Sequence, residues 1–446
     1  MTEEKPKRST IETIARRVAA DRDLTIDIDG TDIVPIVCDQ RFRFMYRVLG
    51  MDVPTVSNIF IKGVSGDGSF VDYLVFVQEK EPTEGSPPLY AIEETKTSDK
   101  ESRNTSAYQR ISKFVYAGFC CPSSKKIMLY DIQGGDESEP TDTNIFGMRI
   151  LLTLGVEIVG RKLDRKIFKE FHDIDELIEF KNSMKPAPTG NVPILVKKFA
   201  NRIEVSGRLY KSGSIGHDPS IGALTGICAA LRKLGWKRRI VITRHGLSQS
   251  HMRGNNKFLK IGAMLNVELK GLGIPQREPI QGYWHYEQRS EKIATIFLHL
   301  VLERTLGLRV IYANHAASER GYFEFPDGKA VPVEKYVQGD RRKGVVSLPD
   351  LVVCDPTGKR IYCFEGKTSD KVAEGIEKLG KLGALEDEYI RKYYQGYAIS
   401  RYVVLFGGDS EKEDPPEVAF RLNSSGEMIL PSYAPGFIKK ALANLP

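Results

Sequence analysis

Two short stretches near opposite ends of the chain combine charged residues in a spacing that could bind a metal ion and activate water. Each has an acidic residue, one spacer and a lysine, Glu94-Thr95-Lys96 and Glu365-Gly366-Lys367, and each continues as Thr-Ser-Asp-Lys. An apolar stretch that opens on an aspartate lies upstream of each, with Asp72 in VDYLVFV and Asp350 in PDLVVCD. The same chemical groups therefore occur twice in the same order.

Strand geometry would bring these groups together. Residues two apart in a strand project from one face, so the glutamate and lysine of each motif point the same way. An antiparallel neighbour would bring the upstream aspartate beside the glutamate. Two carboxylates, the spacer carbonyl and water suit Mg²⁺, which lowers the pKa of a bound water and offsets phosphate charge. The lysine would orient or deprotonate that water, or neutralise the charge that develops during the reaction. The expected metal ligands are Asp72, Glu94, Asp350 and Glu365, and the expected catalytic residues are these four with Lys96 and Lys367.

The acid-spacer-lysine pattern alone is uninformative, because it occurs seven times. The occurrences begin at Glu3, Glu94, Asp164, Glu179, Glu268, Asp327 and Glu365. Only those at Glu94 and Glu365 follow an aspartate-bearing apolar stretch, and only they continue as KTSDK. The plain alternative is a pair of strand-end salt bridges. Three charges pointing inward from apolar strands are costly unless a metal ion or a similar group compensates them, which favours the catalytic interpretation.

The elements around both motifs follow one order. VDYLVFV and LYAIEETK predict two strands joined by the breaker-rich loop QEKEPTEGSPP, an antiparallel pair. A helix with Ser98 as N-cap follows, and KKIMLYDI predicts a buried strand. The apolar stripe of this helix comprises Tyr108, Ile111, Phe114 and Val115. PDLVVCD and RIYCFEGK predict the second strand pair, a helix begins near Ser369, and RYVVLFGG closes the region. The repeated order predicts two mixed α/β cores and suggests a duplication.

Positive charge is concentrated between the two motifs. The chain of 446 residues has a net charge of +7, but residues 181–260 contain 16 Lys and Arg against two acids. This segment carries +14, so the remainder carries −7, which indicates a polyanion partner. Arginine can read guanine edges, and asparagine or glutamine can read adenine. A solvated face or nonspecific phosphate contact is the alternative for any single residue. The DNA-binding candidates are Arg232, Lys233, Lys237, Arg238, Arg239, Arg244, Gln249, Arg253, Asn255, Asn256, Lys257 and Lys260.

Several other classes of protein fit the sequence poorly. The first residues lack the apolar run of a signal peptide, and the longest apolar stretches are too short to span a bilayer, so we expect a cytoplasmic protein without membrane contact. Six scattered cysteines indicate reduced thiols. The glycines of GVSGDGS lack the ending of a P-loop, which argues against a nucleotide cofactor. His245, His251 and His285 fit a His-Asn-His nuclease poorly.

The C-terminal motif resembles the signature of the PD-(D/E)XK nuclease superfamily, which includes most type II restriction endonucleases. The resemblance rests on Pro349, Asp350, Glu365 and Lys367. The Asp72 motif is similar but lacks the proline, which is often replaced in that family. The resemblance covers about two-thirds of the chain and leaves the basic segment unassigned. It implies Mg²⁺-dependent hydrolysis of phosphodiester bonds in double-stranded DNA, with one active site for each strand cut.

The resulting prediction is a mixed α/β protein with two restriction-endonuclease-like cores, each with a mixed central sheet, flanking a basic α+β region. The expected domains are residues 1–182, 183–282 and 283–446. The expected function is a type II restriction enzyme with two catalytic sites in one chain, which permits a monomer without requiring one. The alternatives are a repair or structure-specific nuclease of the same superfamily, and a DNA-binding protein with one or both sites inactive.

Overall fold

Contacts in the computed structural model group the chain into two compact units. Unit 1 comprises Met1–Gly66, Gln78–Glu81 and Tyr286–Pro446, and unit 2 comprises Asp67–Val77 and Pro82–His285. The structure describes residues 8–24, 32–38, 43–49, 58–63, 71–83, 85–95, 106–130, 141–160, 167–184, 193–211, 214–215, 219–253, 257–275, 290–302, 305, 307–314, 320–334, 347–408, 414–423 and 427–443. Where the sequence predicts three regions, the basic segment thus groups with the first motif in unit 2.

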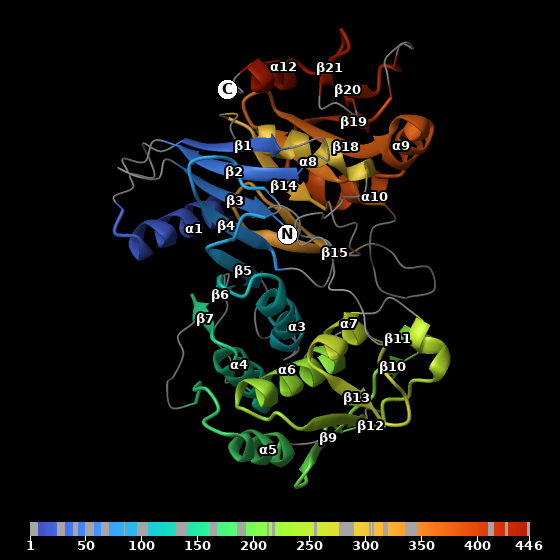
Figure 1. The fold of residues 1–446 in the computed structure, drawn as a ribbon. Helices are drawn as coiled ribbons and strands as arrows, with labels where there is room; N and C mark the ends of the chain where they lie inside the picture. The colour runs from blue at the N-terminus through green and yellow to red at the C-terminus, as the bar shows by residue number, and fades with distance from the viewer. Residues whose placement is uncertain are drawn as a thin grey trace. The chain divides into compact units, whose positions relative to one another are not determined.

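A six-stranded sheet is the centre of the C-terminal part of unit 1 (Figure 1). Its strands in spatial order are β14 (Arg309–Ala313), β17 (Leu351–Asp355), β18 (Arg360–Thr368), β19 (Ala398–Phe406), β20 (Val418–Leu422) and β21 (Met428–Ile429). β17 pairs antiparallel with β14 and β18, whereas β19 pairs parallel with β18 and β20. The mixed pairing confirms the predicted mixed α/β class.

Helices cover both faces of this sheet. They are α8 (Ser290–Leu302), α9 (Val372–Gly380), α10 (Gly383–Leu385), α11 (Arg391–Tyr393) and α12 (Gly436–Ala443). Because strand residues alternate in direction, Leu351 and Val353 pack into one apolar cluster with α8, whereas Val352 and Cys354 pack into another with Leu379 of α9. Both helices thereby approach the same ends of β17 and β18 from opposite faces.

The predicted helix after Ser369 is interrupted. A 3₁₀ turn over Ser369–Lys371 precedes α9, and a π-helical stretch over Glu386–Ile390 separates α10 from α11. Gly380 ends α9 and Gly383 begins α10. The low helix propensity of glycine favours the break between these two helices. The helix at the site is therefore α9 alone.

The N-terminal part of unit 1 contains one helix and a three-stranded meander. Its elements are α1 (Arg8–Asp21), β1 (Asp32–Cys38), β2 (Arg43–Leu49) and β3 (Ile59–Gly63). Ile11, Ile14, Ala15 and Val18 are buried along α1, as their helical spacing predicts. A separate hairpin comprises β15 (Arg320–Glu324) and β16 (Ala330–Glu334).

Unit 2 repeats the mixed strand pattern. Its first strands are β4 (Tyr73–Val77), β5 (Tyr90–Thr95), β6 (Lys125–Tyr130) and β7 (Val156–Val159), with helices α3 (Ser106–Cys120), α4 (Asp142–Thr153) and α5 (Ile174–Ser183). β4 and β5 are antiparallel, as predicted, and β5, β6 and β7 are parallel. The predicted stripe of α3 is buried, whereas the predicted cap Ser98 lies outside the described residues.

The basic segment folds onto these helices through α6 (Pro219–Lys233). Gly226 permits the close approach of α6 to α3, because a Cβ there would lie 2.7 Å from a methyl carbon of Ile111. The segment also forms a sheet ordered β13, β12, β9, β8 and a small β10–β11 ladder. Their bounds are β8 (Val196–Lys198), β9 (Arg202–Ser206), β10 (Tyr210–Lys211), β11 (Ser214–Ile215), β12 (Arg239–Thr243) and β13 (Val267–Leu269). The last helix of this segment, α7 (Lys257–Met264), precedes β13.

Candidate active site

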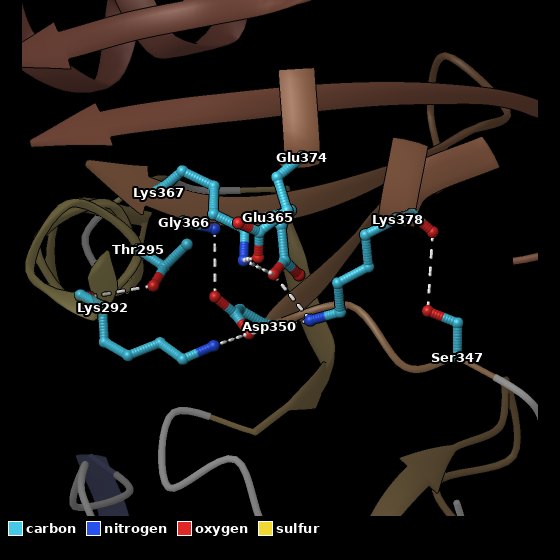
Figure 2. Close-up of polar contacts among 9 residues, drawn as sticks. All are labelled: Lys292, Thr295, Ser347, Asp350, Glu365, Gly366, Lys367, Glu374 and Lys378. Atoms are coloured by element: carbon cyan, nitrogen blue, oxygen red, sulfur yellow. Dashed lines mark hydrogen bonds and ion pairs between the residues drawn. The ribbon is translucent and has the colours of Figure 1, made fainter. Parts of the chain in front are cut away.

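The register of β17 and β18 places Asp350 opposite Glu365 (Figure 2). Leu351 pairs with Phe364, and the amide of Asp350 donates to the carbonyl of Phe364 at 3.0 Å. The amide of Gly366 donates to Oδ2 of Asp350, also at 3.0 Å. Both carboxylates are buried. The strand pair therefore fixes two acidic side chains at one end of the sheet.

Three lysines from three elements surround these carboxylates. Lys292 of α8 donates to Oδ1 of Asp350. Nζ of Lys378, from α9, lies 2.6 Å from Oε1 of Glu365 and 3.9 Å from Oδ1 of Asp350. Nζ of Lys367, on β18 itself, lies 3.5 Å from Oε1 of Glu365. The pairing of buried acids with buried cations offsets much of the desolvation cost of each.

Lys367 is also paired from the helix that follows its strand. Its Nζ donates to Oε1 of Glu374 on α9 at 3.1 Å. Burial alone would lower the pKa of Lys367, but the bond to Glu374 and the charge of Glu365 raise it. The side chain therefore stays a charged donor at neutral pH, which suits orientation of a water or neutralisation of an oxyanion better than proton abstraction.

The spacer of the motif is a glycine for steric reasons. A Cβ on Gly366 would lie 2.3 Å from the carbonyl oxygen of Glu291 and 3.1 Å from the hydroxyl of Thr295. Both belong to α8, so the glycine lets this helix approach the strand closely. The same approach places Lys292, the neighbour of Glu291, beside Asp350.

The two carboxyl groups of this site titrate differently. Burial and the neighbouring charge of Asp350 raise the pKa of Glu365 to about 7, although Lys378 opposes the shift. Burial would also raise the pKa of Asp350, but the charges of Lys292 and Lys378 outweigh it and lower that pKa. Asp350 is thus the more acidic of the two carboxyl groups, and Glu365 is the one that holds a proton more readily.

The donor set at this site fits a hard divalent cation. Oε2 of Glu365 is buried and has no hydrogen-bond partner, which is costly for a carboxylate oxygen. Two carboxylates with the main-chain carbonyl of Gly366 are oxygen ligands of the kind that Mg²⁺ prefers, with water and phosphate completing the shell. No cluster of three or more His, Cys, Asp or Glu side chains suited to a metal occurs among the described residues. The site therefore brings together two carboxylates, those of Asp350 and Glu365.

The Asp72 site in unit 2 has the same geometry, but with a register that differs by one residue from the sequence prediction. Tyr73 pairs with Ile92, so Glu93 lies opposite Asp72. The amide of Glu94 donates to Oδ2 of Asp72 at 2.8 Å, as the amide of Gly366 does at the other site. The Glu94 carboxylate instead accepts a hydrogen bond from the Tyr73 hydroxyl at 2.9 Å. Glu93, not Glu94, thus occupies the position that corresponds to Glu365.

A lysine on the following helix completes this correspondence. Nζ of Lys113, on α3, lies 2.7 Å from Oε1 of Glu93 and 3.5 Å from Oδ1 of Asp72. These contacts match those of Lys378, and Oε2 of Glu93 is buried without a hydrogen-bond partner, like that of Glu365. Nε of Arg110 also lies 2.9 Å from Oε1 of Glu93. The same acid pair and helix cation are therefore built twice.

The electrostatics of the Asp72 site resemble those of the Asp350 site, since Glu93 and Glu365 are both fully buried beside an aspartate. Burial and the charge of Asp72 raise the pKa of Glu93 to about 8, against the opposing charges of Lys113 and Arg110. Burial would lower the pKa of Lys113, but both acids raise it. Glu93 therefore holds a proton at neutral pH more often than Glu365 does.

The two sites differ at the lysine position of the motif. Two residues after Glu365 stands Lys367, whereas two residues after Glu93 stands Thr95. Lys96 lies outside the described residues. Glu93 and three helix lysines, Lys113, Lys292 and Lys378, were not predicted as site residues. The lysines give no sequence signal because a lysine within a helix is ordinarily solvated. The only sequence signal for Glu93 is the Glu93-Glu94 doublet, which puts an acidic residue opposite Asp72 in either strand register.

The DNA-binding candidates fall into groups at the two ends of β12. Lys233, Lys237, Arg238 and Arg239 precede or begin the strand, whereas Arg244, Gln249 and Arg253 follow it, and all seven are exposed. Lys260 is half-buried on α7. Asn255, Asn256 and the side chain of Lys257 lie outside the described residues. The structure therefore does not bring the described candidates into one cluster.

Three of these arginines have structural partners, and one of them, Arg238, donates to the carbonyl of Ala200. The Arg232 guanidinium donates to the carbonyls of Leu265, Trp236, Arg238 and Asn266, tying the end of α6 to the end of α7. Arg239 forms a two-bond pair with Glu268 on β13. Arg232 is thus committed to the fold, and phosphate contact falls to the other exposed cations.

His245 also serves the fold. Its Nδ1 accepts from the amide of Leu247 at 3.0 Å, so Nε2 carries the proton and donates to the carbonyl of Lys270 at 3.0 Å. Both ring nitrogens are used, which leaves none for a metal ion or for proton transfer.

Comparisons with known proteins gave no match: no family model, curated protein or solved structure resembles the chain. Among the helices that the structure describes, none is long and apolar enough to cross a membrane.

Proposed function

We propose that the chain is a Mg²⁺-dependent DNA endonuclease that hydrolyses phosphodiester bonds at the Asp350 site. The observation that carries the proposal is the pairing of Asp350 with Glu365 across β17 and β18, with an unpartnered Glu365 oxygen and with Lys367 on the same strand. This arrangement resembles the motif of the PD-(D/E)XK superfamily. Carboxyl and amine groups with perturbed pKa values that gather at one strand end are frequent at catalytic sites, which supports the proposal.

The residues of the chain prepare this site for a dianionic transition state. The amide of Gly366 fixes the Asp350 carboxylate, and Lys292 and Lys378 stabilise both acids in their charged forms. A bound Mg²⁺ supplies activation of a water and neutralisation of phosphate charge. Lys367, held protonated by Glu374, would donate to the attacking water or to the phosphate oxygen that gains charge.

We propose double-stranded DNA as the substrate and a type II restriction activity as the biological role. The exposed cations around β12 support DNA binding, since phosphate neutralisation dominates affinity for DNA. Arg244, Gln249 and Arg253 in the loop after β12 offer the side chains that read base edges. A repair nuclease of the same superfamily is the second candidate, because the same catalytic groups would serve it.

We assign cutting to the Asp350 site alone. The Asp72 site keeps two carboxylates and a helix lysine, but the residue in the position of Lys367 is Thr95. The Asp72 site therefore has no lysine two residues after its buried glutamate to donate to the charge that develops in the transition state. One chain would then cut one strand per encounter, and a double-strand break would need two chains. This replaces the expectation of two cutting sites in one chain.

Supercoiled plasmid incubated with the protein and Mg²⁺ tests this assignment. Discrete fragments support a restriction enzyme, a smear supports a nonspecific nuclease, and intact plasmid in both Mg²⁺ and Mn²⁺ would refute both. Asp350→Asn should abolish cleavage. Lys381→Ala, an exposed α9 lysine paired only with Glu377 in the described contacts, is the matched control and should cleave normally. One cutting site per chain predicts that nicked circles accumulate first at low protein concentration.

A further inference from the structure

A surface cavity in unit 2 has a composition that the proposed cleavage site does not explain. Its volume is about 620 Å³, within the range of small-molecule sites. It lies between the β8–β9 turn and the chain reversal that follows α6. The lining residues are Lys198, Phe199, Ala200, Gly235, Trp236, Lys237 and Arg238.

The backbone of this cavity is firmly built. Gly235 has φ of +95°, a left-handed conformation that favours glycine and ends α6. The amide of Trp236 then donates to the carbonyl of Leu231 at 2.9 Å. Arg238 donates to the carbonyl of Ala200 and so joins the two turns. The lining side chains are therefore held on a fixed frame.

Cations from both turns surround the cavity. Lys237 and Arg238 are exposed on one side, and Lys198 stands on the other. Lys198 pairs with Asp175, whose side chain is 73% exposed. An ion pair at such a surface contributes little free energy, so a phosphate group can compete for this lysine. The charge of the cavity thus suits an anionic ligand.

Two aromatic rings stand among these cations. Phe199 is 39% exposed, which is unusual for a phenylalanine, and the guanidinium of Arg202 lies 4.4 Å from its ring centroid. The indole of Trp236 is fixed by a hydrogen bond from Nε1 to the carbonyl of Arg239 at 3.1 Å. Aromatic rings interleaved with cations are the features that hold the bases and phosphates of a single strand.

We propose that this cavity binds a nucleotide of single-stranded DNA, with its base against Phe199 and Trp236 and its phosphate between Lys198 and Lys237. A base inside a duplex is stacked on its neighbours and cannot offer its face to a protein ring, whereas an unpaired base can. An acidic peptide would use the cations but not the rings. The site rests only on residues of unit 2 and does not depend on cleavage, so it adds an unpaired-strand contact to the proposed endonuclease.

Tryptophan fluorescence of the full-length chain tests the proposal. Replacing Trp284 by Phe leaves Trp236 as the single reporter among the two tryptophans of the sequence. Titration with an oligothymidylate in EDTA, where no cleavage occurs, should quench Trp236. Phe199→Ala should weaken binding about tenfold, the usual effect of losing one base stack. Lys237→Gln should weaken it and reduce the slope of log affinity against log salt by about 0.7.

Matched variants and competitors decide the outcome. Phe119→Ala removes another exposed phenylalanine of unit 2, and Lys169→Gln removes another exposed lysine; both should bind like the parent chain. Equal affinities for Phe199→Ala and Phe119→Ala would overturn the proposal. Equal quenching by polyglutamate or by a blunt duplex would overturn it as well. The titration runs in EDTA without cleavage, so its failure and the failure of the cleavage assay are distinguishable.

Discussion

The Asp350 site of unit 1 and the Asp72 site of unit 2 share a framework but differ in their cations. At each site a strand pair places an aspartate opposite a buried glutamate, a main-chain amide holds the aspartate, and a helix lysine bonds the glutamate. The Asp350 site adds Lys292 from α8 and Lys367 from its own strand. The Asp72 site adds Arg110 from α3, which contacts Glu93.

The cations of the two sites come from different elements of the fold. At the Asp72 site, Lys113 and Arg110 both come from α3 and both contact Glu93. At the Asp350 site, the cations come from both faces and from the strand, so Lys367 is not needed to hold Asp350. Lys367, two residues after Glu365, corresponds in sequence to Thr95, so under the proposed function it is the residue that distinguishes the two sites.

The largest expected effect tests that difference directly. Lys367→Ala should reduce cleavage about 10²- to 10³-fold, the usual loss when one donor to transition-state charge is removed. Lys96→Ala should leave cleavage within about twofold, because it belongs to the motif that lacks a lysine in register. Initial rates of plasmid nicking measure both. Equal losses in the two variants would show that both sites cut and would restore the two-site prediction.

A second test compares the helix lysines. Lys113→Met should destabilise the protein by about 3 kcal/mol, because it leaves Asp72 and Glu93 buried with less compensating charge. Lys378→Met should cost less than half of that, since Lys378 is 28% exposed and since Lys292 and Lys367 remain beside the acids. Urea unfolding in EDTA measures the difference. A cost for Lys378→Met as large as that for Lys113→Met would contradict the ranking.

Sequence could predict both strand pairs, because alternating apolar residues and a breaker-rich connection define them. It could not predict the register of the first pair. A one-residue slip moves every side chain of a strand to the other face, and the Glu93-Glu94 doublet offers an acid in either register. The shared KTSDK suggested that Glu94 matches Glu365, yet the pairing of Tyr73 with Ile92 puts Glu93 there.

The helix cations were also beyond sequence reasoning. Lys292 lies on α8, where its neighbours Ile293, Ala294 and Thr295 are also buried. The spacing of apolar residues along the sequence does not show that a lysine among them would be buried too. The helix predicted to begin near Ser369 begins as a 3₁₀ turn over Ser369–Lys371, and α9 then ends at Gly380.

A third prediction concerns pH. Burial raises the pKa of Glu365 to about 7 and that of Glu93 to about 8, both from an ordinary value of 4.5. The unfolded chain releases these protons first, so each glutamate lowers stability as pH rises from about 4.5 to its folded pKa. Replacing either by glutamine removes this loss. In EDTA, the melting temperature of Glu365→Gln relative to the parent should therefore rise by several degrees up to pH 7, and that of Glu93→Gln up to pH 8.

Melting curves at pH 5, 7 and 9 resolve the two windows. Glu427→Gln, on an acid outside both sites, serves as the control and should show no such trend. A relative melting temperature that falls between pH 5 and pH 9 for either site variant would contradict the assigned pKa shift.

The smallest expected effect concerns Glu94, which the sequence motif and the strand register assign differently. If register decides, Glu94 is a strand residue whose carboxylate accepts from the Tyr73 hydroxyl at 2.9 Å. Glu94→Gln should then keep cleavage within about twofold and cost less than about 1 kcal/mol of stability, since a glutamine oxygen still accepts that bond. Tyr73→Phe should cost a similar amount, because it removes the donor of the same bond. The informative outcome is a loss of cleavage in Glu94→Gln without loss in Glu93→Gln, because only a β5 shifted by one residue would place Glu94 opposite Asp72.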